Sequence, residues 1–132
     1  MQHMRYLNLF SDITRVRTSQ CFKYNETIFF CVPRALVSRA IGEEGRNTKK
    51  LNYILNRKIK VIPLPEGIED LRVFIQSIVN PVTFKNIELR DNEVLLSAST
   101  QSKAALIGRN KRRLLEMQRI IKDFFAKEFR II

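Results

Sequence analysis

Two segments built on one plan, 66 residues apart, restrict the possible folds of this chain more than any other feature. In each, an apolar helical stretch meets a glycine turn, and a basic, amphipathic helical stretch follows at once. The first segment, 40–47, reads AIGEEGRN, and the second, 105–113, reads ALIGRNKRR. Glycine permits close backbone approach, and the first amides of the following helix have no helical acceptor, so such a turn suits a phosphate group. The repetition predicts two copies of one small domain.

The residues around the two turns predict the same order of elements twice. Hydrophobic periodicity and turn residues in the first half predict a helix at 5–13, strands at 16–24 and 27–32, helices at 34–41 and 47–56, and a strand at 59–62. The second half predicts a helix at 68–79, strands at 84–90 and 93–98, a helix at 101–107, a long helix through 114–124, and a strand at 129–132. We therefore expect an α+β fold with domains at 4–64 and 65–132, each a three-stranded sheet packed on helices.

The charge of the chain favours a polyanionic partner. Its 24 Lys and Arg against 13 Asp and Glu give a formal net charge of +11 over 132 residues. Residues 1–66 hold 12 basic and 5 acidic side chains, and residues 67–132 hold 12 and 8, so both halves are basic. This distribution argues against a neutral domain with one basic tail and points to nucleic acid.

The two cysteines flank the first predicted hairpin, and their relation depends on its turn. A two-residue turn at Asn25-Glu26 pairs Cys21 with Phe30 and puts the thiols on opposite sheet faces, whereas a three-residue turn sets Cys21 directly across from Cys31. The N-terminus has no signal-peptide pattern, so we expect a soluble, cytoplasmic protein with reduced, buried thiols.

The first turn resembles the signature of the KH family, a small apolar residue and Ile-Gly-x-x-Gly followed by a helix and a strand, here Ile41-Gly42-Glu43-Glu44-Gly45. The helix and two strands before it resemble the type II arrangement, and two such units resemble archaeal NusA-like transcription factors. This resemblance implies binding of single-stranded RNA, less often DNA, in a groove between the glycine loop and the closing strand. It places the apolar floor at Ala40, Ile41, Leu51 and Ile62 in the first copy and at Ala104, Ile107, Leu114 and Ile131 in the second.

The predicted RNA-binding residues lie at and beside the two turns. In the first copy they are Arg39, Ile41, Gly42, Gly45, Arg46, Asn47, Lys49 and Lys50. In the second they are Lys103, Ile107, Gly108, Arg109, Asn110, Lys111, Arg112 and Arg113. Glu43 and Glu44 oppose a phosphate at the first turn, while Lys111 stands where the second turn would have its second glycine. We expect the second turn, with its dense positive cluster, to bind RNA more tightly.

Simpler interpretations stand beside these. A glycine turn can join two helices and bind nothing, and a charge run is usually a solvated helix face. The apolar stripe residues, such as Leu51, Leu114 and Ile121, are expected in the core. Four aromatic residues of the first hairpin could form a base-stacking platform, but one face of the sheet should pack on helices. These residues are Phe22, Tyr24, Phe29 and Phe30.

Catalysis and cofactor binding find no support in the sequence. The only histidine is His3, and the two cysteines lack partners for a zinc site. We therefore expect a non-catalytic, monomeric protein without cofactor or metal. The resemblance to NusA-like factors implies that it binds single-stranded RNA in transcription termination, antitermination or elongation, with RNA polymerase as a further partner. A ribosomal or ribosome-assembly KH protein, or a polymerase-docking adaptor with weak RNA binding, fits the same features. Membrane association of the C-terminal helix is disfavoured, because its apolar stripe is needed as core.

Overall fold

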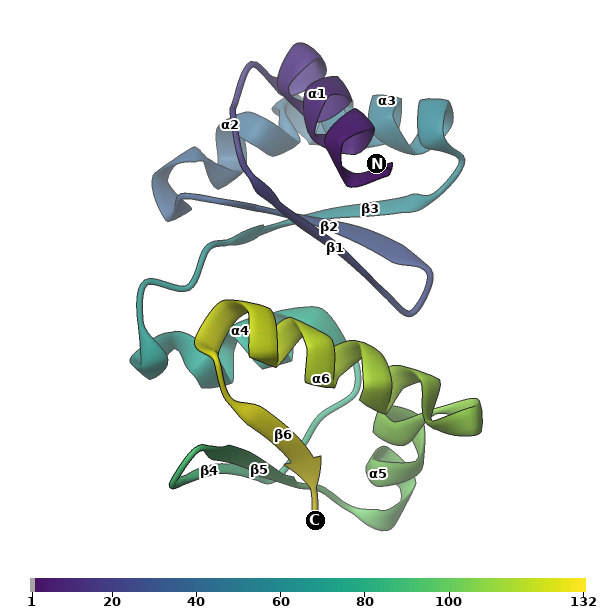
Figure 1. Cartoon of the computed structure of the whole chain (residues 1–132). Helices are drawn as coiled ribbons and strands as arrows, with labels where there is room; N and C mark the ends of the chain where they lie inside the picture. The colour runs from purple at the N-terminus through teal and green to yellow at the C-terminus, as the bar shows by residue number, and fades with distance from the viewer. Residues whose placement is uncertain (1) are drawn as a thin grey trace. The chain divides into compact units, whose positions relative to one another are not determined.

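The computed structural model describes residues 2–132, and the side chains from Met4 onward. The side chain of His3 therefore lies outside the described residues. The chain divides into two compact units, Met1–Leu64 and Pro65–Ile132. Each unit packs helices against a sheet of three strands, so the predicted α+β class is confirmed (Figure 1). None of the described helices is long and apolar enough to cross a membrane.

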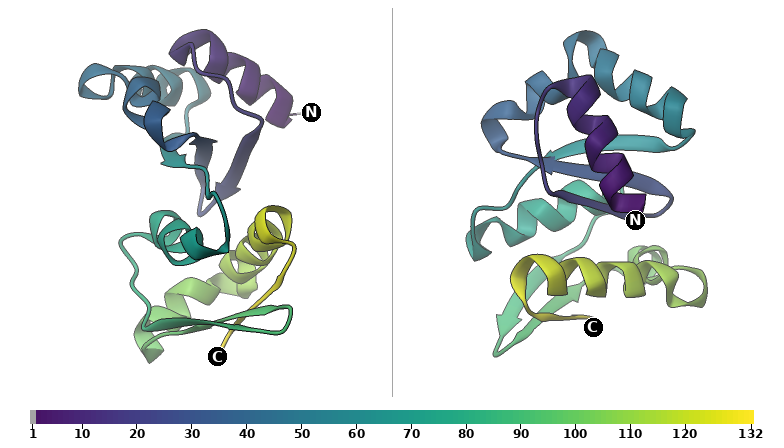
Figure 2. Two further views of the ribbon diagram at one scale, coloured as in Figure 1. Left: turned by 90° about the vertical axis from the view of Figure 1, so that its left-hand side faces the viewer. Right: turned by 45° about the horizontal axis from the view of Figure 1, so that its top comes forward.

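The first unit has the predicted order of elements. They are α1 (Gln2–Thr14), β1 (Gln20–Tyr24), β2 (Thr27–Val32), α2 (Val37–Ile41), α3 (Arg46–Leu55) and β3 (Lys58–Pro63), with 3-10 turns at Arg34–Leu36 and Glu43–Gly45. Strand β2 is central, antiparallel to β1 and parallel to β3. The three helices lie over one face of this sheet (Figures 1 and 2).

Strand β1 begins four residues later than predicted, at Gln20 and not at Val16. Val16 is 3% exposed and belongs to the core, although it lies in the connection between α1 and β1. Its backbone amide donates to Thr14 Oγ1 at 3.0 Å, which holds the connection against the end of α1. The β-branched residue that favoured a strand here is used for packing in a loop.

The first hairpin closes with a two-residue turn. Tyr24 pairs with Thr27 and Cys21 with Phe30, and the turn residues have positive φ. The side chains of Cys21 and Cys31 therefore point to opposite faces of the sheet. Both cysteines are free, Cys31 is buried, and Cys21 is half-buried.

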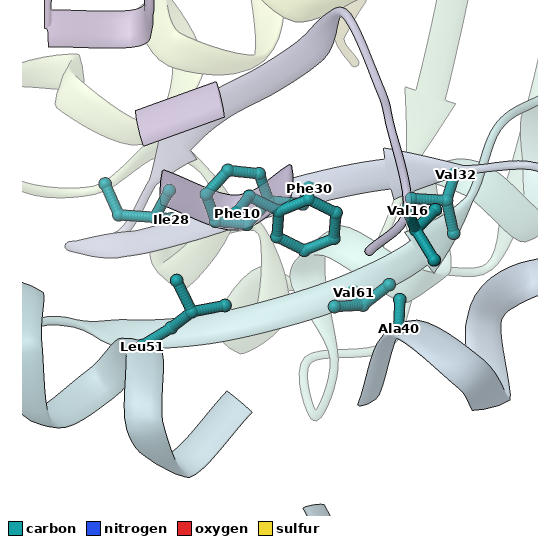
Figure 3. Packing of buried hydrophobic residues seen from close by; sticks show 8 residues of the cluster. All are labelled: Phe10, Val16, Ile28, Phe30, Val32, Ala40, Leu51 and Val61. Atoms are coloured by element: carbon teal, nitrogen blue, oxygen red, sulfur yellow. The ribbon is translucent and has the colours of Figure 1, made fainter. Parts of the chain in front are cut away.

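The core of the first unit ties the helices on both sides of the glycine turn to the sheet. Phe10 of α1 stacks on Phe30 of β2 with ring centroids 4.3 Å apart. Ala40, near the end of α2, and Leu51, in the middle of α3, are both fully buried in the same cluster (Figure 3). The turn is thus anchored at both ends by buried side chains.

The second unit repeats this plan. Its elements are α4 (Leu71–Val79), β4 (Asn86–Arg90), β5 (Glu93–Ser97), α5 (Thr100–Ile107), α6 (Arg112–Phe125) and β6 (Glu128–Ile131), with 3-10 turns at Ile68–Asp70 and Arg109–Lys111. Strand β5 is central, antiparallel to β4 and parallel to β6. Helix α6 has 14 residues where α3 has 10, so it is about one turn longer.

Candidate nucleic-acid interface

The two glycine turns begin with the same strained backbone. Gly42 has φ 83° and ψ 165°, and Gly108 has φ 76° and ψ 171°. This region of backbone space is essentially open to glycine alone. Each glycine amide donates to the carbonyl oxygen four residues earlier, at Ser38 or Ala104, over 3.0 Å. The first glycine of the motif is therefore required in both copies.

The end of each turn is left-handed, and here the two copies differ in sequence but not in shape. Gly45 has φ 74° and ψ 21°, and Lys111 has φ 61° and ψ 22°. A Cβ at Gly45 would meet Thr48 Oγ1 at 3.4 Å, an ordinary contact, so this position has room for a side chain. A non-glycine residue in this conformation costs about 1–2 kcal/mol. The loss of the second glycine therefore leaves the second turn's backbone in place, with a cation at its end.

Asn47 fastens the first turn. Its Nδ2 donates to the carbonyl oxygen of Ala40 at 3.1 Å and lies 3.4 Å from that of Arg39. Its Cγ would be 3.0 Å from a Cβ at Gly42, so the amide packs directly over the glycine. The predicted RNA contact at Asn47 is thus a side chain already engaged in closing the turn.

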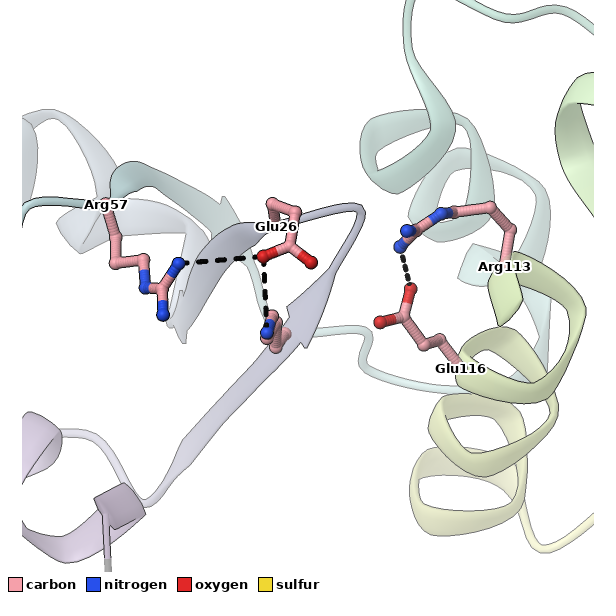
Figure 4. Close-up of polar contacts among 5 residues, drawn as sticks. Glu26, Arg57, Arg113 and Glu116 are labelled. Atoms are coloured by element: carbon pink, nitrogen blue, oxygen red, sulfur yellow. Dashed lines mark hydrogen bonds and ion pairs between the residues drawn. The ribbon is translucent and has the colours of Figure 1, made fainter. Parts of the chain in front are cut away.

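Arg113 occupies the corresponding place in the second turn. Its Cγ would lie 2.6 Å from a Cβ at Gly108, so its stem covers that glycine. Its guanidinium forms an ion pair with Glu116, and the two side chains are only 14% and 21% exposed (Figure 4). Arg113, one of the predicted basic cluster, is therefore held against its own helix by this ion pair.

The remaining cations of the second turn are available to a ligand. Arg109, Lys111 and Arg112 are exposed, and Lys103 on α5 is half-buried. Asn110, also exposed, has φ 57° and ψ 27° at the centre of the turn. In the described part of the chain, the three exposed cations form no ion pair. The second turn thus presents three positive charges without a neighbouring carboxylate of its own.

The first turn has a mixed surface. Glu43 and Glu44 are exposed at its tip, and Glu44 has φ 55° and ψ 29°, like Asn110 in the second turn. Four predicted contacts, Arg39, Arg46, Lys49 and Lys50, are exposed around it. The two carboxylates reduce the attraction of this turn for a phosphate.

The apolar floor predicted for the first copy is largely inaccessible. Ala40 and Leu51 are fully buried and Ile62 is 6% exposed, because all three pack inside the unit. Only Ile41 is partly exposed beside the turn. In the second copy the four predicted floor residues are partly or fully exposed: Ala104, Ile107, Leu114 and Ile131.

The aromatic residues of the first hairpin cannot form the stacking platform that the sequence allowed. Phe22, Tyr24, Phe29 and Phe30 are all at most 9% exposed, and the rings of Phe22 and Phe29 stack on each other at 5.1 Å. Among the described aromatic residues, Tyr53 on α3 is instead the most exposed, at 87%. The exposure of Tyr53 could have been predicted from helical spacing, since Tyr53 is about 200° around the helix from the buried Leu51.

Comparisons with known proteins find similarity over most of the chain. No protein-family profile matches the chain. The chain is 27% identical over 106 residues to the "Probable transcription termination protein NusA" of Methanococcus vannielii, a match that covers 77% of this chain and 60% of the relative. The chain thus spans about three fifths of that relative's length. The crystal structure of APE1850 matches with a TM-score of 0.65 and 25% identity, covering 99% of this chain and 96% of that one.

Proposed function

We propose that this chain is a tandem pair of type II KH domains that binds single-stranded RNA at its glycine turns and acts in transcription. The observation that carries the proposal is the shared backbone of the two turns, Gly42–Gly45 and Gly108–Lys111, each between a helix end and a helix start and each surrounded by exposed cations. The element order on both sides of each turn and the similarity to a NusA protein support it. A glycine turn of this kind brings backbone amides and basic side chains close to a sugar-phosphate chain.

The proposed action is occupancy of a short RNA segment, without a chemical step. Basic side chains hold the phosphates, and the partly exposed apolar residues beside the turn contact bases. The second turn contributes more affinity, because Arg109, Lys111 and Arg112 act without a carboxylate among them. A monomeric cytoplasmic protein of this kind would influence termination, antitermination or elongation through nascent RNA, in contact with RNA polymerase.

A second candidate is an adaptor that docks on RNA polymerase and binds RNA weakly. The exposed pair Glu43 and Glu44 favours it, because two carboxylates at the tip of the first turn suit a basic protein surface better than a phosphate. A ribosomal or ribosome-assembly role uses the same RNA-binding turns. Copurification with polymerase or with ribosomal particles separates these roles.

The test of RNA binding is a titration with single-stranded RNA, single-stranded DNA and duplexes of matched length at several salt concentrations. We expect single-stranded RNA to bind most tightly, and its affinity to fall steeply with salt because the cations displace counterions from the phosphates. Gly42→Asp tests the first turn, because it adds both a charge and a side chain where only glycine fits. A folded wild-type protein that binds none of these ligands at low salt overturns the proposal.

A further inference from the structure

The solvent side of helix α3 carries an aromatic ring among unpaired cations. We define the α3 solvent face as Arg46, Lys49, Lys50 and Tyr53, which recur at three- and four-residue spacing on the side opposite the buried Leu51. Helix α3 has no acidic residue, and in the described part of the chain these three cations form no ion pair. Arg57, beyond the helix, is excluded from this face because it pairs with Glu26 at 3.6 Å (Figure 4).

The corresponding side of α6 lacks this combination of an exposed aromatic ring and unpaired cations. The positions 66 residues later are occupied by Arg112, Leu115, Glu116 and Arg119. Glu116 pairs with Arg113, and Arg119 lies 4.0 Å from Asp123. On α6, Arg113 and Arg119 are therefore paired with acids, Arg112 is left without such a pair among the described residues, and none of these four positions carries an aromatic ring.

The α3 solvent face continues directly from the first glycine turn. Arg46 is the first residue of α3, and Cε of Lys49 lies 3.8 Å from the position of a Cβ on Gly45. Tyr53 follows Arg46 by seven helical positions, a rise of about 10 Å. A nucleic-acid strand that leaves the turn along α3 meets cations first and the Tyr53 ring next.

We propose that the α3 solvent face is an auxiliary site for single-stranded nucleic acid, in which a base stacks on Tyr53 and the neighbouring phosphates contact Lys49 and Lys50. This inference rests on the proposed function, since it extends the RNA path beyond the glycine turn. Every base has a π-face, so a stacked tyrosine accepts any unpaired base but no base inside a duplex. The site supplies affinity to a turn whose tip carries Glu43 and Glu44.

The first experiment replaces the ring. Tyr53→Ala should weaken binding of a long single-stranded RNA by about five- to tenfold, at the low end of the range for loss of one base–aromatic stack, while Tyr53→Phe binds as the wild type does. Leu115→Ala is the matched control, because Leu115 is a 59% exposed apolar residue on α6. The chain has three tyrosines and no tryptophan, so tyrosine fluorescence quenched by RNA in the wild type and less quenched in Tyr53→Ala reports stacking directly.

The second experiment removes one charge. Lys50→Gln should lower the slope of log affinity against log salt by about 0.7, the value for one phosphate contact to a single strand, whereas the exposed Arg119→Gln leaves it unchanged. The auxiliary site is overturned if the α3 variants keep the affinity, quenching and salt slope of the wild type while Arg109→Glu/Lys111→Glu loses binding. That result leaves the proposed function standing. Weaker binding by the α3 variants, with unchanged binding by Arg109→Glu/Lys111→Glu, supports the auxiliary site and contradicts binding at the second turn. A wild-type protein that binds no single strand overturns both.

Discussion

The side-chain amide of Asn47 reaches back across the first glycine turn to the backbone carbonyl oxygen of Ala40, 3.1 Å away. Ala40 is fully buried, so this hydrogen bond ties the turn to the core of its unit. The second turn has no amide at this place and is covered by the stem of Arg113 instead. One backbone shape is therefore held by two different side-chain arrangements.

Asn47→Ala should lower the free energy of unfolding by about 1 kcal/mol, because it leaves a carbonyl at the helix end without its side-chain donor. It should also weaken RNA binding at the first turn. Urea denaturation followed by circular dichroism measures the loss. The matched control is Asn52→Ala on the same helix, whose Nδ2 donates to the carbonyl of Arg57 in an exposed position and should matter less. Equal effects of the two variants would show that Asn47 does not hold the turn.

Transferring the tip of the second turn into the first should improve RNA binding. Glu43→Arg with Glu44→Asn copies Arg109 and Asn110 onto a backbone of the same shape, since Glu44 and Asn110 differ in φ by only 2°, 55° against 57°. We expect a gain of about tenfold for single-stranded RNA, as for one new charge-assisted hydrogen bond. Fluorescence anisotropy with a labelled RNA measures it. A double variant that folds and binds no more tightly means that the acidic tip does not limit the first turn.

Replacing Lys111 by glycine should raise the stability of the fold and lower its affinity for RNA. The substitution relieves the left-handed strain and stabilises the chain by about 1 kcal/mol, but it removes an exposed cation and weakens RNA binding. Ala126→Gly at the end of α6 is the control, because Ala126 has φ 57° and carries no charge. It should raise the thermal midpoint and leave RNA affinity unchanged. An RNA affinity of Lys111→Gly equal to that of the wild type argues against a phosphate contact at Lys111.

The two thiols should be unreactive while the protein is folded. Burial raises the pKa of Cys21 from 9.0 to about 11, and burial, with a smaller contribution from Cys21, raises the pKa of Cys31 to about 12. Each thiol has a higher pKa in the folded chain than in the unfolded chain. The contribution of the protonated thiols to the free energy of unfolding is therefore complete below pH 9 and is lost as the pH rises through 11 to 12. An aromatic disulfide reagent at pH 8 should react slowly until urea is added. Rapid labelling of both cysteines without denaturant contradicts this burial.

The sequence allowed the order of elements to be predicted, because helical and strand periodicities are clear on both sides of each turn. It also distinguished the two hairpin registers without choosing between them, and the structure has the two-residue turn at Asn25-Glu26. The start of β1 was wrong because Val16, a good strand residue, is packed into the core from a loop. Local propensity there is outweighed by burial.

The chemistry of the turns was less predictable from residue types alone. Gly45 and Lys111 look different in sequence but adopt the same left-handed backbone, whereas Gly42 and Gly108 occupy a region that excludes other residues. The number of glycines therefore does not reveal that the second turn has the same backbone shape as the first. Likewise, a list of cations could not reveal that Arg113 is paired with Glu116, since that depends on side-chain packing.

The most direct test of the central claim compares the RNA affinities of two double charge reversals, one in the second turn and one on the helix that follows it. Arg109→Glu/Lys111→Glu changes the second turn, and Arg119→Glu/Lys122→Glu changes exposed cations farther along α6. Titrated with one single-stranded RNA at low salt, the turn variant should lose at least about tenfold in affinity and the α6 variant much less, because the turn cations contact phosphates and the others do not. Equal losses, or full binding by a folded turn variant, would contradict RNA recognition at the second glycine turn, to which we assign most of the affinity.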